Sequence, residues 1–211
     1  MHDVVKRAMD VLLGLLFLVA FSPLFCLTAL LIKLDSEGPV FFRQKRCGKG
    51  GREFFMYKFR TMIKNAEAMK EALTNEVDGP MFKVKKDPRI TKIGRVLRQW
   101  SLDELPQLIN VVRGEMSLVG PRPLAKNEMP VTVEELPFTK DKTPVDITWK
   151  ETRLRVKPGM TGLWQVQGRG SGKFSCWIKY DIEYVQKRSI FLDVKILFLT
   201  LNAVLRRKGA D

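Results

Sequence analysis

Hydrophobic positions are concentrated in one N-terminal run. The run extends without a charged residue from Val11 to Ile32 (VLLGLLFLVAFSPLFCLTALLI). At about 1.5 Å per residue it can cover the roughly 30 Å hydrocarbon core of a bilayer. Ser22 and Pro23 interrupt it near its middle. Pro23 has no N–H for the carbonyl of Val19 and its ring bends a helix, whereas the Ser22 hydroxyl can bond back to a carbonyl one turn earlier.

Two topologies fit this run: a kinked spanning helix, or a re-entrant helix that turns at Ser22 and Pro23. A single span places Lys and Arg mainly on its cytoplasmic side. Here Lys6 and Arg7 precede the run and Lys33 follows it, so both topologies stay open on the pattern alone. A cleaved signal peptide is disfavoured because the run is long and lacks an obvious A-x-A site.

The rest of the chain predicts an α+β fold that is mostly helical, with one small β-hairpin. PVFFRQ and REFFMYKFR are strand-like and are joined by a glycine-rich turn from Cys47 to Gly51. The final apolar run, residues 190–208, contains Asp193 and Lys195, which favours an interfacial or core-packing helix over a span. Residues 126–150 predict an irregular acidic excursion. Helical composition covers residues 62–74, 90–100, 103–113 and 175–188.

Length and charge narrow the functional classes. The 211 residues suit one globular domain, expected at 36–211, behind a membrane anchor at 1–35. The net charge of +14 favours phosphate-bearing partners, such as nucleic acid, anionic lipid or a nucleotide. The three cysteines have no C-x-x-C spacing, which argues against a zinc site or a disulfide framework. Because His2 is the one histidine, acid–base chemistry must come from other side chains.

The stretch SLDELPQLINVVRGEMSLVGPRP, residues 101–123, has the most specific pattern. Ser101 and Glu104 fit a common helix-capping box, but Pro106 would then lie too deep in the helix. A helix that begins at Asp103 tolerates Pro106 in its first turn, and its dipole would keep Asp103 ionised as a nucleophile or metal ligand. The adjacent Glu104 repels Asp103 unless cations offset both charges.

Several motifs together resemble the bacterial sugar transferase family, the monotopic phosphoglycosyl transferases that begin cell-surface glycan assembly. They are the Ser-Pro-broken hydrophobic helix, YKFRTM, DPRITKIGRVLRQWSLDELPQLINVVRGEMSLVGPRP, VKPGMTGLWQVQGR and YDIEYV. The resemblance extends from about Lys6 to Leu205, and only 126–150 falls outside it. It favours the re-entrant topology, at the cytoplasmic face of the bacterial inner membrane.

The resemblance implies transfer of a sugar-1-phosphate from a UDP-sugar to a polyprenol (undecaprenyl) phosphate, with release of UMP. Asp103 would attack the β-phosphate and form an aspartyl-phosphosugar intermediate, and Glu104 would assist deprotonation of the lipid phosphate. Mg²⁺, with Mn²⁺ as the alternative, would be bound by Asp103. The implied partners are these two substrates and membrane lipids, with no nucleic acid, and a homodimer is left open.

The same resemblance supplies further site residues. Asp181 and Tyr184 of YDIEYV match the family in a supporting or packing role. The asparagine usual after QxxGR is Gly170 here, so the resemblance does not extend to the nucleotide or sugar contacts of that asparagine. The expected phosphate-binding residues are Lys58, Arg60, Arg98, Arg122 and Arg169.

Two other classes compete with a transferase. A membrane-tethered basic adaptor would account for the charge and the anchor, but the chain carries no recognisable nucleic-acid-binding motif. A hydrolase with two carboxylates, of the glycosidase type, needs a separation that neighbours such as Asp103 and Glu104 do not readily give.

Overall fold

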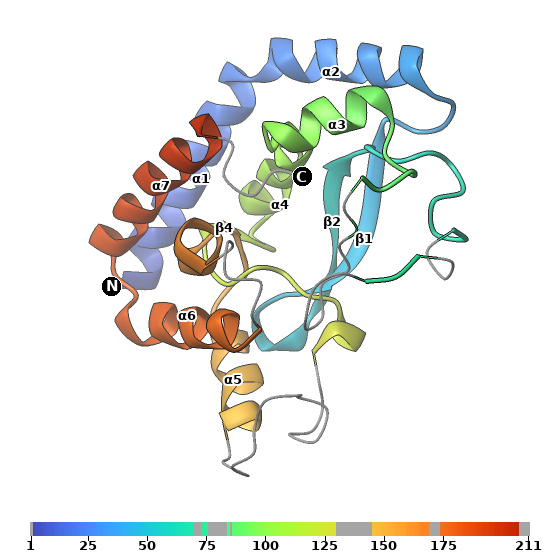
Figure 1. Cartoon of the computed structure of the whole chain (residues 1–211). Coiled ribbons are helices and arrows are strands. Elements are labelled where there is room, and N and C mark those ends of the chain that lie inside the picture. The colour runs from blue at the N-terminus through green and yellow to red at the C-terminus, as the bar shows by residue number, and fades with distance from the viewer. Residues whose placement is uncertain are drawn as a thin grey trace.

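The fold is α+β, mostly helical, and contains a small antiparallel hairpin, as expected. The computed structural model describes residues 2–69, 73–75, 84, 86–129, 145–168 and 174–206 (Figure 1). The helices are α1 (His2–Ala20), α2 (Ser22–Asp35), α3 (Lys92–Gln99), α4 (Gln107–Arg113), α5 (Val145–Leu154), α6 (Phe174–Lys187) and α7 (Ile190–Leu205). The strands are β1 (Phe41–Cys47), β2 (Glu53–Phe59), β3 (Ser117–Val119) and β4 (Gly159–Thr161).

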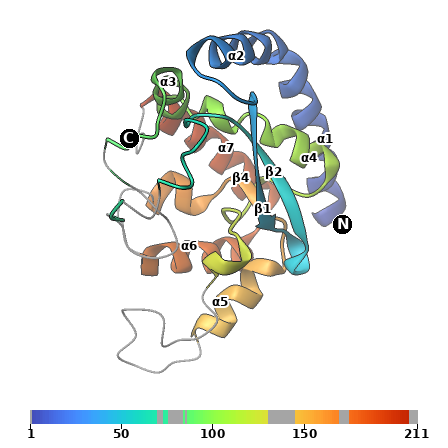
Figure 2. The ribbon, with the colours of Figure 1, turned by 90° about the vertical axis from the view of Figure 1, so that its right-hand side faces the viewer.

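The expected hairpin is confirmed. Strands β1 and β2 pair antiparallel, from Phe41 opposite Phe59 to Cys47 opposite Glu53, and the glycine-rich turn joins them. Along β2 the side chains alternate, because Phe54 and Met56 are buried whereas Phe55 is exposed. Figure 2 shows the hairpin in front of the helices, with α2 above it. A short parallel pair, β3 with β4, lies in the body of the molecule.

Most of the expected helices form, with one clear exception. Residues 90–100 and 175–188 correspond to α3 and α6, and the last apolar run forms α7. The helix expected at 62–74 is wrong, because residues 64–69 form turns. Helix-forming composition is a weak signal where the chain lacks a regular apolar stripe to bury. Of the acidic excursion expected to be irregular, 130–144 lies outside the described residues, and the expectation is wrong at 145–150, which belong to α5.

The N-terminal apolar run breaks where Ser22 and Pro23 predicted. No single helix among the described residues is long and apolar enough to cross a membrane, whereas α1 and α2 together satisfy that criterion with a 59° bend between them. The Ser22 hydroxyl donates to the carbonyl of Val19 at 2.8 Å, the same carbonyl that Pro23 leaves without its usual donor. The break is therefore chemically compensated.

Helix α1 is fastened to the rest of the protein by both apolar and polar contacts. Leu13 and Phe17 pack against a core that includes Leu108 and Ile196. The polar contacts join Lys6 to Asp193 (2.6 Å), Arg7 to the carbonyls of Val111 (2.6 Å) and Val112 (2.7 Å), and Asp10 to the Ser117 hydroxyl and the Leu118 amide (3.0 Å each). The first helix of the expected anchor is thus packed into the domain that follows it.

Helices α1, α2 and α7 also expose apolar side chains, which we call the outer apolar face. A helix that is apolar on both sides needs a second apolar environment besides the protein core. The members of this face are Val4, Leu12, Leu15, Leu16 and Val19 on α1, Leu27, Leu30 and Leu34 on α2, and Phe191, Phe198, Leu201 and Leu205 on α7.

Replacing Lys6 with Met is expected to destabilise the protein by about 3–5 kcal/mol, because Asp193 would remain buried without its cation. The matched control is Lys45→Met, whose exposed pair with Glu53 spans 3.9 Å and should contribute less than about 1 kcal/mol. Denaturant unfolding of the detergent-solubilised variants measures both changes. Equal losses for the two variants would contradict the role of the Lys6 contact.

Candidate functional site

The two adjacent carboxylates lie between α3 and α4. Asp103 and Glu104 belong to a short 3₁₀ turn (Leu102–Glu104), and α4 begins only at Gln107. Pro106 is the residue immediately before α4, so its missing N–H costs no hydrogen bond within that helix. The expectation that one helix begins at Asp103 is wrong, and so is the alternative capping box, because the Ser101 side chain makes no capping bond.

A residue in the left-handed conformation directs the chain into the turn that carries Asp103 and Glu104, which we call the dyad. Ser101, with φ of 54°, has the conformation usually taken by glycine at the end of a helix, and its amide bonds to the carbonyl of Arg98 at 3.0 Å. This turn ends α3 and directs the next residues inward. Asp103 is buried with 8% of its surface exposed, which is unusual for a carboxylate without a cation nearby.

Cations from three separate segments surround the dyad. Lys58 on β2 donates to Oε1 of Glu104 at 2.8 Å, and NH1 of Arg122, in the loop after β3, lies 3.8 Å from the same oxygen. Arg98 comes from the last turn of α3, and its Nε donates to Oγ1 of Thr61 at 2.9 Å. The structure thus brings together three of the five cations expected from the sequence.

Burial and the surrounding cations act in opposite directions on the pKa of Asp103. Burial raises the pKa of its carboxyl group, and the charge of Glu104 adds to this rise. The positive charges of Lys58, Arg98 and Arg122 lower the pKa, with Lys58 acting most strongly. The helix dipole proposed from sequence does not apply, since the 3₁₀ turn is too short to supply one. The nearby cations are therefore what favours the ionised carboxylate.

Arg60, a fourth predicted phosphate-binding residue, makes its contacts away from Asp103 and Glu104. Arg60 is buried, and its NH2 donates to the carbonyls of Ile32 (3.3 Å) and Ser36 (2.6 Å) and to the Ser36 hydroxyl (3.0 Å). Its guanidinium group therefore covers the end of α2, and phosphate binding by Arg60 stays a prediction. Arg169 lies outside the described residues, as does Gly170.

Asp181 and Tyr184 on α6 are both buried. The Tyr184 hydroxyl is within hydrogen-bond distance of the Val119 carbonyl (3.0 Å) and of Asp193 (2.8 Å). Asp181 accepts from the indole of Trp149 at 3.2 Å and lies 3.6 Å from the buried guanidinium of Arg153.

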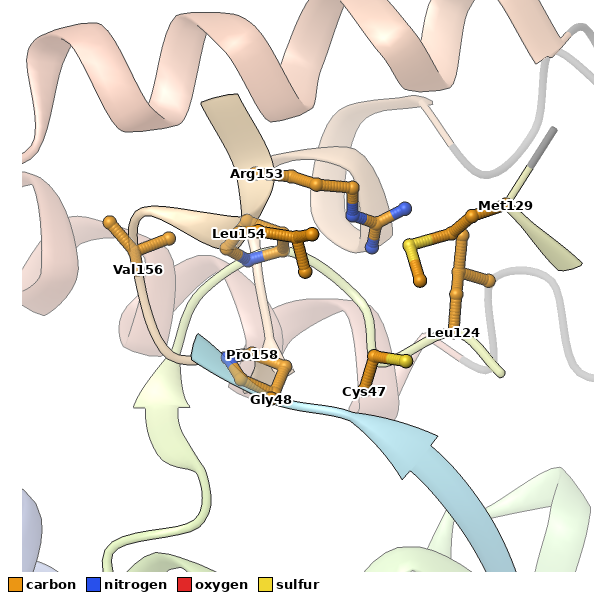
Figure 3. A pocket seen from close by; sticks show the side chains of 9 residues that line it. Cys47, Gly48, Leu124, Met129, Arg153, Leu154, Val156 and Pro158 are labelled. Carbon is orange, nitrogen blue, oxygen red and sulfur yellow. The ribbon is translucent and has the colours of Figure 1, made fainter. Parts of the chain in front are cut away.

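Arg153 connects α5 to the loop that carries Arg122. Its NH2 donates to the main-chain carbonyl of Arg122, and its guanidinium stacks over the ring of Trp149. Figure 3 shows this guanidinium directed toward Met129 and Leu124 in a small pocket that Cys47 also lines. Sequence reasoning did not identify Arg153, since one arginine in a strongly basic chain carries no distinguishing signal. Thr61 was also missed, although it belongs to the YKFRTM motif.

Asp181 should give the stability of the protein a distinctive pH dependence. Burial raises its pKa from 3.8 to about 6, so the native state keeps this proton over a pH range where the unfolded chain has lost it. The free energy of unfolding, relative to Asp181→Asn, should therefore fall by about 3 kcal/mol as the pH rises from 3 to 7 and then level off. Urea unfolding at a series of pH values measures this change.

The control for this prediction is Asp87→Asn, because Arg89 lowers the pKa of Asp87 through a side-chain hydrogen bond. The stability of the wild type relative to this variant should rise with pH above the native pKa and level off above about pH 4. Slopes of the same sign for the two variants would contradict the assignment of Asp181.

Comparison with known proteins identifies relatives along the whole chain. The family model for bacterial sugar transferases matches residues 1–207. The exopolysaccharide production protein ExoY of Rhizobium meliloti (strain 1021) is 40% identical over 211 residues, covering 97% of this chain and 87% of that protein.

Two longer relatives carry enzyme names. The UDP-glucose:undecaprenyl-phosphate glucose-1-phosphate transferase of Escherichia coli (strain K12) is 40% identical over 95% of this chain and 40% of its own length. The undecaprenyl-phosphate galactose phosphotransferase of Salmonella typhimurium (strain LT2) is 39% identical over 97% of this chain and 41% of its own length. This chain spans about two fifths of each of them. With a family match over nearly all its residues, the chain belongs to the bacterial sugar transferase family and is an enzyme of that family.

Proposed function

We propose that this chain transfers a sugar-1-phosphate from a UDP-sugar to a polyprenol phosphate, releases UMP, and performs the first membrane step of bacterial surface glycan synthesis. The observation that carries the proposal is the buried Asp103 beside Glu104, with Lys58, Arg98 and Arg122 converging on them. Relatives with about 40% identity are named for transfer to undecaprenyl phosphate. Membership of a transferase family removes the reason to prefer an adaptor or a glycosidase-type hydrolase.

The proposed reaction has two displacements at one phosphorus atom. An Asp103 oxygen attacks the β-phosphorus, the bond from that phosphorus to the oxygen shared with the α-phosphate breaks, and UMP leaves with the bonding electrons. An oxygen of the lipid phosphate then attacks the same phosphorus and frees Asp103. Glu104 accepts the proton of the lipid phosphate where one is present. Lys58, Arg98 and Arg122 offset the phosphate charges, which is the main requirement of phosphoryl transfer.

The carboxylates also suit a divalent cation, which we propose to be Mg²⁺, with Mn²⁺ as the alternative. Mg²⁺ in proteins is commonly held by one or two carboxylates together with substrate phosphates. Across the described ranges no group of three or more His, Cys, Asp or Glu residues gathers, so substrate oxygens would have to complete the site. Asp103 is the proposed protein ligand. When bound, such a cation supplies additional neutralisation of phosphate charge.

We also propose that the outer apolar face lies against the cytoplasmic leaflet of the inner membrane, and that α1 and α2 enter it and return. The 59° bend at Ser22 and Pro23 and the apolar side chains that point away from the core support this arrangement. It would bring a lipid-borne phosphate and a water-soluble nucleotide sugar to the same surface. Burying apolar side chains stabilises such contact by about 25 cal/mol per Å².

Asp103→Asn is expected to reduce UMP release by at least about a thousandfold, because the amide cannot act as the nucleophile. The assay contains Mg²⁺, undecaprenyl phosphate and a panel of UDP-sugars. With lipid omitted, mass spectrometry should detect a sugar-phosphate adduct on the wild type and none on this variant. Glu53→Gln, an exposed carboxylate on the hairpin, is the control and should retain activity. Undiminished release by Asp103→Asn would eliminate the proposed nucleophile.

Reporters placed at residue 1 and directly after residue 35 are expected to lie on the same, cytoplasmic side of the membrane. The polar contacts of Lys6, Arg7 and Asp10 hold the start of α1 against the body, and the chain re-enters that body after α2. Accessibility of single introduced cysteines to a membrane-impermeant reagent measures this arrangement. Reporters found on opposite faces would establish a spanning helix instead.

A further inference from the structure

Thr61 is the point at which the end of β2 meets α3. It is buried, and its carbonyl accepts the amide of Thr91 at 3.1 Å. Gly94 in the first turn of α3 packs directly on this residue, since a Cβ there would lie 2.1 Å from the Thr61 carbonyl oxygen. A side chain at position 94 would push the two segments apart. Thr61 therefore fixes where α3 lies relative to the strand that carries Lys58.

The side chain of Thr61 also holds Arg98, at the other end of α3. Its Oγ1 accepts the Nε–H of Arg98 at 2.9 Å. A guanidinium group is planar and rigid, so fixing its Nε leaves little freedom for the direction of its two terminal NH₂ groups. Burial lowers the pKa of Arg98, and the negative charge of Asp103 is the strongest influence that raises it again. The guanidinium group of Arg98 is therefore close enough to Asp103 to interact with its charge.

We propose that Thr61 is a positioning residue, which orients the guanidinium group of Arg98 toward the phosphates of the nucleotide-sugar donor. The inference rests on the proposed function, because it assigns Thr61 a part in that reaction. Thr61 itself contacts no reacting atom. Its hydroxyl acts through Arg98, and its main chain keeps β2 and α3 on either side of Asp103. A hydroxyl is required at this position, whereas a methyl group of the same size is insufficient.

The test compares Thr61→Val with Thr61→Ser. Valine keeps the shape of threonine and removes the acceptor, so kcat/KM for the UDP-sugar should fall by about 10- to 100-fold, the scale of a hydrogen bond to a charged group. The loss should appear mainly as a higher KM for the donor, because its phosphates are charged before and after transfer, with the KM for lipid phosphate unchanged. Serine keeps the acceptor and should remain within about threefold of the wild type.

Thr91→Val is the matched control for a merely structural effect. The Thr91 hydroxyl accepts the amide of Gly94 at 2.9 Å and caps the same helix, yet it makes no contact with Arg98. Its loss should lower the melting temperature while the KM for the donor stays unchanged. If Thr91→Val raises this KM as much as Thr61→Val does, loosening of α3 accounts for both effects and the inference is wrong.

A double-mutant cycle completes the test. In an Arg98→Lys background, Thr61→Val should add less than about a twofold loss, because the guanidinium that Thr61 orients is gone. Independent, multiplicative losses would overturn the inference. If Thr61→Val and Thr61→Ser have equal kinetics in an active enzyme, the inference about Thr61 is wrong and the proposed function is unaffected. A wild type that releases no UMP from any UDP-sugar would instead overturn the proposed function and this inference with it.

Discussion

The proximity of two carboxylates in a largely buried turn is the constraint on which the rest of the site depends. Asp103 and Glu104 are neighbours in sequence, so their mutual repulsion cannot be relieved by separating them. Burial raises the pKa of Asp103 further and disfavours its charge. Cations close to the dyad offset both effects, and they come from a strand, a helix and a loop that are far apart along the chain. The fold brings these three segments to one place.

Helix α1 is attached to the same segments that carry and flank the dyad. Arg7 covers the last carbonyls of α4, the helix that directly follows the dyad. Asp10 accepts hydrogen bonds from the start of β3, whose following loop carries Arg122. Apolar packing has little directional preference of its own, whereas hydrogen bonds and ion pairs have a defined geometry. These directional polar contacts fix the position of α1, and they link the orientation of the proposed membrane segment to the geometry of the site.

Sequence reasoning reached the features that depend on local chemistry. The hairpin follows from alternating side chains and a glycine-rich turn, and the break at Ser22 and Pro23 follows from a missing N–H. It failed where tertiary packing decides. Helical composition at 62–74 yields turns at 64–69, and Pro106 immediately precedes α4 rather than lying within a helix that starts at Asp103.

From the sequence, the phosphate-binding side chains could be predicted only by the motif in which they occur. Tertiary contacts decide which of them lie at the dyad. Lys58 and Arg60 are two residues apart in YKFRTM, but β2 ends at Phe59, so that Lys58 lies on the strand and Arg60 after it. Lys58 consequently reaches Glu104, whereas Arg60 covers the end of α2. Residue type alone does not distinguish these outcomes. Arg153 shows the same limit, since its contact with the Arg122 carbonyl joins residues 31 positions apart that only the tertiary fold brings together.

The buried pair of Arg153 and Asp181 positions the loop that carries Arg122 and adds little net stability. Removing two charges from water costs several kcal/mol, which their attraction only partly restores, as the raised pKa of Asp181 indicates. An apolar pair of similar volume could fill the same space with equal or greater stability. It could not donate a hydrogen bond to the main chain of Arg122. The energetic cost of burying this pair is therefore explained by its hold on the loop whose Arg122 faces Glu104. A contribution to stability alone would not explain that cost.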